Sequence, residues 1–296
     1  MKRLVVALCV LCAAVACGGG SPEAPKKKVI GVTLLTQADA FFKDLEAGLR
    51  EEAQAKGFDL VIRDGDKDPP KQASQIEDFV AQKVAAIIVV PCDSASVVPA
   101  LAGPERAGIP VFTADIAAHG GRVVAHVASD NVQGGRLAGE ELATLMGGKG
   151  KVVIIDHPTV ASVQDRVKGF EEALKKYPGI TIVAKPSANG NRDKATQVME
   201  DMLQAHRDIT GVFGINDSTA LGAAGVIEAA KRKDIVVVGF DASDEAQAAI
   251  RKGGPLKADV VQYPRKIGQT IIDVIAKHLA GESVPKLVPI EVGIWK

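Results

Sequence analysis

Residues 235–241, with the sequence IVVVGFD, form the feature that most constrains this chain. A short run that is apolar on both faces predicts a strand buried in a parallel sheet, and here it ends in an acid, Asp241. Two further apolar runs end in the same way, one at Asn216 and one at Asp115. Ligands of open α/β sheets bind outside the carboxyl ends of the strands, so these side chains are candidates for one site.

Strand and helix patterns alternate from Val29 to the C-terminus. The predicted strands are 29–35, 58–62, 85–90, 109–114, 122–127, 152–155, 180–184, 256–261 and 288–294, with two more at Val212 and Val236. The predicted helices are 41–56, 69–83, 94–106, 131–146, 163–177, 192–206, 218–231, 245–252 and 264–280. Repeated strand–helix units predict parallel sheets covered by helices, and there are too many for one sheet. We therefore expect an α/β fold of two doubly wound parallel-sheet lobes.

Composition excludes several functional classes. The 296 residues carry 36 basic and 36 acidic side chains, so no basic surplus exists to hold nucleic acid. Neither the dinucleotide fingerprint nor phosphate-loop spacing is present, and Gly134, Gly135 and Gly139 fall inside a predicted helix, where they permit close packing. Cys92 is the single cysteine of the expected folded part, which leaves no disulfide or cysteine metal site. We expect no cofactor and no metal.

The first residues have the character of a secretory signal. A charged start precedes an apolar run that is too short to span a bilayer, which predicts a signal peptide over residues 1–16. The run ends in AVAC, which resembles a bacterial lipoprotein cleavage box with Cys17 as the lipidated residue. Residues 17–28 then form a glycine-containing tether. An ordinary signal peptide with a nearby cysteine is the alternative.

Several segments taken together resemble one family. They are DAFF at 39–42, HVASDN at 126–131, DRVKGF at 165–170, ND at 216–217 before ALG at 220–222, and VVGFD at 237–241. This ordered set is similar to the periplasmic sugar-binding proteins of ABC transporters, the type I periplasmic binding proteins, nearest their ribose-binding branch. The resemblance extends from about Val29 to the C-terminus.

The resemblance implies two lobes joined by a hinge of three chain crossings, near Ser129, Gln262 and Glu291. The N-terminal lobe would comprise residues 29–129 plus 263–291. The C-terminal lobe would comprise residues 130–262 plus 292–296.

The resemblance also implies a set of ligand-binding residues. They are Asp39, Phe41, Phe42, Asp115, Arg166, Asn216, Asp241 and Gln262. Carboxylates accept pairs of sugar hydroxyls, a guanidinium fork donates to ring and hydroxyl oxygens, and aromatic rings pack on the apolar face of a sugar.

Plainer interpretations exist for several of these positions. Phe41 could belong to the core, and Arg166 could be a solvated charge. Asp217 and Asp244 are interpreted as helix N-caps, and Asp130 or Asn131 as the cap of the helix over 131–146.

The departures from the ribose branch concern the ligand. Val90 and Ile116 stand where that branch has an Asn and an Arg, and residues 189–191, NGN, replace an expected aromatic. Among the listed site residues, three acids face Arg166 alone, which disfavours anions in a closed site. We expect a neutral monosaccharide or polyol, with ribose bound more weakly than the best ligand.

The leading hypothesis is a substrate-binding lipoprotein of an ABC importer that captures its ligand by hinge closure and delivers it to a permease. It would act as a monomer in the periplasm or at the cell surface, attached to the membrane only through lipid on Cys17. An alternative is a sensory module that presents its closed form to a membrane kinase or chemoreceptor. An enzyme using Asp115 and Asp241 is a third hypothesis, but no nucleophile, metal or cofactor motif supports it.

Overall fold

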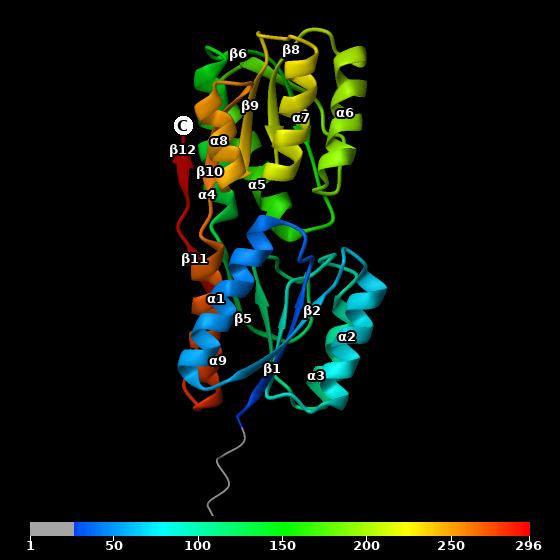
Figure 1. Cartoon of the computed structure of the whole chain (residues 1–296), viewed down its shortest axis with the longest axis vertical. Coiled ribbons are helices and arrows are strands. Elements are labelled where there is room, and N and C mark those ends of the chain that lie inside the picture. Colours follow the sequence, from blue (N-terminus) through cyan, green and yellow to red (C-terminus); the bar gives the residue numbers. More distant parts are fainter. Residues whose placement is uncertain (1–26) are drawn as a thin grey trace, which may run out of the picture.

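The structure is a computed structural model that describes residues 27–296. The predicted signal peptide, Cys17 and nearly all of the tether lie outside the described residues. The described chain forms two stacked lobes, each built around a six-stranded sheet (Figure 1). The strand orders are β11-β5-β4-β3-β1-β2 and β12-β10-β9-β8-β6-β7. The expected architecture of two doubly wound α/β lobes is confirmed.

The first sheet pairs its strands in parallel throughout, and the second does so except at β12. The strands of the first sheet are β1 (Val29–Leu34), β2 (Asp59–Asp64), β3 (Ala86–Val89), β4 (Val111–Ala114), β5 (Val123–Ser129) and β11 (Leu287–Ile290). The second contains β6 (Lys149–Ile155), β7 (Gly179–Ala184), β8 (Ile209–Gly214), β9 (Val236–Asp241), β10 (Leu256–Val261) and β12 (Gly293–Trp295).

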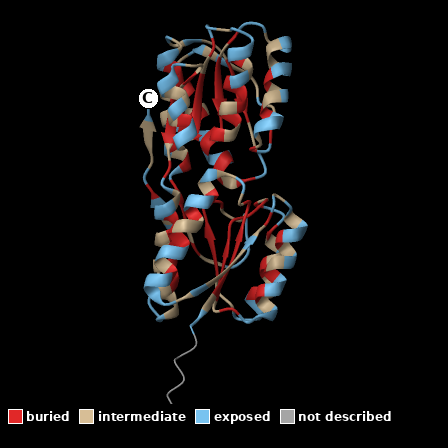
Figure 2. Ribbon diagram, in the orientation of Figure 1, coloured by how far each residue is buried: buried red, intermediate tan, exposed pale blue. Residues whose placement is uncertain are grey.

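Helices cover both sheets, with buried strands at the centre of each lobe and exposed helix faces outside (Figure 2). The first lobe has α1 (Ala40–Lys56), α2 (Pro69–Ala81), the 3-10 helix η1 (Val98–Leu101), α3 (Ala102–Arg106) and α9 (Pro264–Leu279). The second has α4 (Asn131–Leu145), α5 (Ala161–Leu174), α6 (Arg192–Ala205), α7 (Asp217–Ala229) and α8 (Asp244–Lys252).

The chain passes between the lobes three times: after β5, after β10, and between β11 and β12. The single closing strand predicted over 288–294 is wrong, because it is divided at the third passage. β11 pairs in parallel with β5 in the first sheet, whereas β12 pairs antiparallel with β10 in the second. Glu291 interrupts the predicted run at this passage, where the resemblance placed the third chain crossing, so the sequence did contain a sign of the division.

Two other predicted elements also need correction. The helix expected over 94–106 is instead a loop followed by η1 and the five-residue α3. Pro99 and Pro104 interrupt it, because proline has no amide proton to donate in a helix. The strand expected over 152–155 begins earlier, at Lys149, because Gly150 adopts φ +130° and pairs with Ile180 of β7, which continues the sheet.

Close helix pairs stabilise each lobe. In the second lobe, a Cβ added at Gly135 of α4 would overlap the carbonyl oxygen of Arg166, and one added at Gly169 of α5 would overlap that of Val132. In the first lobe, Gly48 of α1 similarly faces the backbone of α9. The expected close packing through the α4 glycines is therefore confirmed, and it brings the backbone of α5 against α4 at Arg166.

Candidate functional site

A cavity of about 460 Å³ lies between the lobes, at the carboxyl ends of strands from both sheets. This volume lies within the range of small-molecule sites. All eight residues predicted from the sequence line it: Asp39, Phe41, Phe42, Asp115, Arg166, Asn216, Asp241 and Gln262. The fold thus brings together side chains that are more than 200 positions apart in the sequence.

The first lobe contributes two acids, Asp39 and Asp115, and two aromatic rings. Asp115 follows β4 with φ +61°, a conformation that non-glycine residues seldom adopt and that occurs preferentially at functional sites. Its side chain is buried, and its Oδ1 has no hydrogen-bond partner among the described residues. Burial raises the pKa of Asp115 to about 6, and the nearby Arg166 guanidinium acts against this rise.

The two rings lie in the first turn of α1, with centroids 5.2 Å apart in an edge-on arrangement. Phe42 is buried in the core and also lines the cavity. Phe41 is partly buried, packs against the core and also lines the cavity.

Arg166 of α5 is a buried cation and not a solvated charge. Its Nε donates to Asn131 Oδ1 at 2.9 Å, and its Nη1 donates to the Ile215 carbonyl oxygen at 2.7 Å. The guanidinium carbon also lies 3.9 Å from the centroid of the Phe240 ring, within cation–π distance. These three contacts hold the planar fork in one orientation at the cavity wall.

Asp241 and Gln262 stand together at the ends of β9 and β10. Gln262 Nε2 donates to Asp241 Oδ1 at 2.7 Å, and Gln262 Oε1 is buried without a hydrogen-bond partner among the described residues. Asp241 has φ +123°, again a strained value for a residue with a side chain. Burial raises the pKa of Asp241 well above its ordinary value, and Asp217 raises it further, whereas Arg166 lowers it.

A second layer of carboxyl groups lies behind Asp241. Asp259 in β10 and Asp217 at the start of α7 are both buried, and Asp217 Oδ1 and Asp259 Oδ2 have no hydrogen-bond partner among the described residues. Burial and the charge of Asp217 raise the pKa of Asp259 well above its ordinary value. Sequence reasoning missed Asp259, because it lies inside a strand and not at a strand end.

The N-caps predicted for α7 and α8 are wrong. Asn216, not Asp217, caps α7, where it forms a reciprocal capping box with Thr219, and Ser243, not Asp244, caps α8. The carboxylate of Asp217 instead accepts from the Ser243 amide at 2.8 Å.

At α4, Asp130 is the cap, as one of the two alternatives proposed. Asn131 instead holds Arg166 through its side-chain oxygen.

Val90 is fully buried in the core and does not line the cavity, whereas Ile116 does. Burial also raises the pKa of the Cys92 thiol to about 12, which agrees with a small apolar filler.

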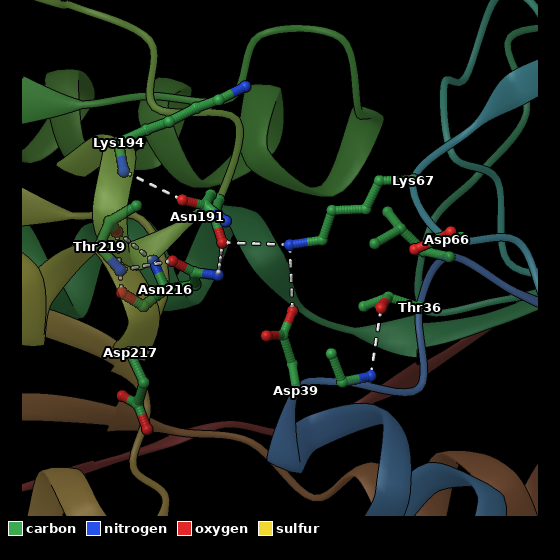
Figure 3. A network of polar contacts seen from close by, with 12 residues as sticks. Thr36, Asp39, Asp66, Lys67, Asn191, Lys194, Asn216, Asp217 and Thr219 are labelled. Atoms are coloured by element: carbon green, nitrogen blue, oxygen red, sulfur yellow. Dashed lines mark hydrogen bonds and ion pairs between the residues drawn. The ribbon is translucent and has the colours of Figure 1, made fainter.

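Lys67 was missed and reaches across the mouth of the cavity (Figure 3). Its Nζ lies 3.3 Å from Asp39 Oδ2 in its own lobe and 3.4 Å from the Gly190 carbonyl oxygen in the other. Gly190 O also accepts from Asn216 Nδ2 at 3.3 Å, so this loop connects the lysine to α7.

His157, also missed, lines the cavity after β6, and burial lowers its pKa to about 4. Lys67 and His157 both follow strands, so the strand-end rule would have found them if it had been applied to every strand.

Comparison with known proteins identifies the family. The model of the periplasmic binding protein domain matches residues 30–283. The chain belongs to the periplasmic binding protein family. The ribose import binding protein of Salmonella typhimurium is 34% identical over 272 residues, covering 92% of this chain and 91% of the relative. A D-apiose import binding protein of Actinobacillus succinogenes is 36% identical, covering 79% of this chain and 76% of the relative.

Solved structures agree with this assignment. An ABC transporter solute-binding protein of Mycobacterium smegmatis with bound glycerol superimposes with a TM-score of 0.86. It is 35% identical, and the match covers 91% of this chain and 94% of that one. The expected substrate-binding role in ABC import is confirmed at the level of the family, which is periplasmic and consists of binding proteins, not enzymes.

Two further observations concern the described residues 27–296. They contain no group of three or more His, Cys, Asp or Glu side chains arranged to hold a metal. Nor does this part of the chain contain a helix with the length and apolar character needed to span a membrane.

Proposed function

We propose that the cavity captures a neutral monosaccharide or polyol, which the two lobes enclose by closing about the hinge. The observation that carries this proposal is a pair of buried side chains, Asp115 and Gln262, which line one cavity and each keep an acceptor oxygen, Oδ1 and Oε1, without a donor among the described residues. Sugar hydroxyls are donors of the required kind. The rings of Phe41 and Phe42 supply an apolar surface for the face of a sugar. The same eight lining residues are the proposed ligand contacts.

The charges of the cavity favour a neutral ligand. Asp115, Asp217 and Asp241 lie in or directly behind its wall, opposite Arg166. Lys43, Lys67 and Arg192 also line the cavity, but Lys67 is paired with Asp39, Arg192 is paired with Glu245, and Lys43 is exposed. The acid surplus therefore remains, and it repels anions most strongly once water is excluded. Sugar phosphates and uronic acids should bind poorly.

The chemistry of the wall bears on which neutral ligand fits best. Ile116 is an apolar residue of the first-lobe wall, and it favours a ligand with a hydrocarbon edge on that side. Relatives and neighbours are named for ribose, D-apiose, xylitol, D-allose and myo-inositol, so the family accommodates sugars of several sizes. We propose that ribose binds this chain, but not as its tightest ligand.

A thermal-shift screen followed by calorimetry tests the ligand class. The panel comprises those five compounds with D-tagatose, and ribose 5-phosphate and galacturonate serve as matched anionic controls. A native-state ligand raises the melting temperature by mass action. We expect at least one neutral compound to bind and the anions to bind about 100-fold more weakly or not at all. Tight binding of an acidic sugar, or ribose as the best of the panel, would contradict the proposal.

We further propose that the two lobes, with boundaries 29–129 plus 263–291 and 130–262 plus 292–296, act as a monomer and deliver ligand to an ABC permease. Lipid on Cys17 would anchor the protein to the outside of a bacterial membrane. Cys17→Ala should abolish incorporation of a tagged fatty acid, because the thiol is the attachment point, while calorimetric binding stays unchanged. A labelled variant would exclude Cys17 as the lipidation site.

A further inference from the structure

Ser94 makes two hydrogen bonds that cross from the first lobe to the second. It lies in the loop after β3 and is fully buried. Its amide donates to the Thr159 carbonyl oxygen at 3.0 Å, and its hydroxyl accepts from the Ala161 amide at 2.9 Å. Thr159 and Ala161 belong to the loop and first turn that lead from β6 into α5. The backbone and the side chain of this one residue thus connect the two lobes.

The contact gives a hydrogen-bond acceptor to the first amide of α5, which has no side-chain cap from its own lobe. The N-cap residue of α5 is Val160, whose side chain cannot accept a hydrogen bond, and α5 has no side-chain cap. The Ser94 hydroxyl supplies this acceptor from the opposite lobe. Because α5 also carries Arg166, the cap fixes the end of the helix that holds the cavity guanidinium.

The position of Ser94 makes this contact sensitive to hinge motion. The three hinge passages leave from β5, β10 and the β11–β12 connection, at one edge of each sheet. Ser94 follows β3 and meets the loop after β6, nearer the opposite edge of both sheets. Lys67, after β2, meets Gly190, after β7, on that same side. Rotation about the hinge separates groups in proportion to their distance from it, so both contacts exist only when the lobes are together.

We propose that Ser94 is a positioning residue for closure: its hydroxyl caps α5 across the cleft in the closed form and thereby slows release of a bound sugar. The inference rests on the proposed capture by hinge closure and adds the residue that holds the closed state. Ser94 itself does not line the cavity, so it acts through α5 and Arg166 rather than on the sugar.

The test compares Ser94→Ala with Ser96→Ala. Ser96 belongs to the same loop but is exposed, and its amide donates to Asp93 Oδ1 at 2.7 Å within its own lobe. Loss of one neutral hydrogen bond corresponds to about a three- to tenfold change in an equilibrium constant. For the neutral sugar that gives wild type the largest thermal shift, stopped-flow binding should show dissociation faster by about that factor in Ser94→Ala. The association rate and the melting temperature without sugar should match wild type, and Ser96→Ala should match it in all three.

A second measurement follows the capped amide itself. In the sugar-bound protein, hydrogen exchange at the Ala161 amide should be about threefold faster or more in Ser94→Ala than in wild type or Ser96→Ala, because the amide loses its acceptor. Unchanged exchange at Ala161, or an unchanged dissociation rate, would overturn the role of Ser94. Equal acceleration in Ser96→Ala would instead assign the effect to the loop as a whole and overturn it too. If wild type binds no panel compound, the proposed function itself fails, whereas unchanged dissociation and exchange in a protein that does bind sugar would overturn only the role of Ser94.

Discussion

At the scale of single residues, the strand-end acids carry both strain and charge. Asp241 combines φ +123° with a buried carboxyl whose pKa burial raises. A residue placed there for stability alone would be glycine or a neutral side chain. We therefore expect Asp241→Asn to weaken binding of the best panel sugar by about 10- to 100-fold, since hydrogen bonds to charged groups exceed neutral ones. Calorimetry measures the affinity.

The same substitution should leave the unfolding free energy unchanged or higher, because it removes a desolvated acid beside Asp217. Asp130→Asn is the matched control, since Asp130 is an exposed N-cap outside the cavity and Asn caps equally well. An affinity for Asp241→Asn within twofold of wild type would contradict a ligand-binding role for this carboxylate.

At the scale of elements, the α4–α5 pair determines where Arg166 stands. Gly169 of α5 touches the backbone of α4, where an added Cβ would overlap the Val132 carbonyl oxygen. Gly169→Ala should therefore lower the unfolding free energy by about 1–3 kcal/mol, the usual effect of overpacking. It should also weaken sugar binding, because α5 must move away from α4 and carries Arg166 with it. Urea denaturation measures the stability.

Gly225 of α7 is the matched control, because an added Cβ there would meet no atom within 4 Å. Gly225→Ala should raise the unfolding free energy by about 0.5–1 kcal/mol, the intrinsic preference of a helix interior for alanine. If both substitutions shifted stability in the same direction, packing between α4 and α5 would not explain the effect at Gly169.

At the scale of the whole molecule, the cleft couples stability to pH. Burial raises the pKa of Asp115 to about 6, so the folded state takes up a proton at higher pH than the unfolded state does. Asp115 therefore lowers the unfolding free energy above about pH 6. This destabilisation disappears as pH falls toward the pKa that Asp115 has in the unfolded state. Asp115→Asn should be more stable than wild type by about 1–3 kcal/mol near pH 7.5, and the difference should shrink near pH 5.

His126 makes stability change with pH in the opposite direction. Burial lowers its pKa to about 4, so the unfolded state takes up the proton first, and wild type loses stability as pH falls below about 6.5. His126→Gln should therefore gain on wild type toward pH 5, where Asp115→Asn loses its advantage. Urea denaturation at both pH values measures each difference. Parallel pH profiles for the two variants would show that neither group titrates as its burial implies.

Much of this protein was predictable from local sequence. Apolar runs identified the buried strands, glycines inside a helix pattern predicted close packing of α4, and acids at strand ends indicated the cavity wall. Each of these signals is a periodicity or a position relative to one element, and such patterns reflect burial, which neighbouring residues share.

Only the tertiary structure decided which partner each polar group has. In the structure the two halves of the last predicted strand pair with different sheets. Asn131, a candidate cap, instead accepts a hydrogen bond from Arg166, and Ser94 accepts one from the first residue of α5 in the other lobe. A hydrogen bond depends on where two atoms lie in space, and here those atoms are 35 and 67 positions apart in the chain. Local patterns determine which residues are buried, whereas the path of the chain between the lobes determines what they meet there.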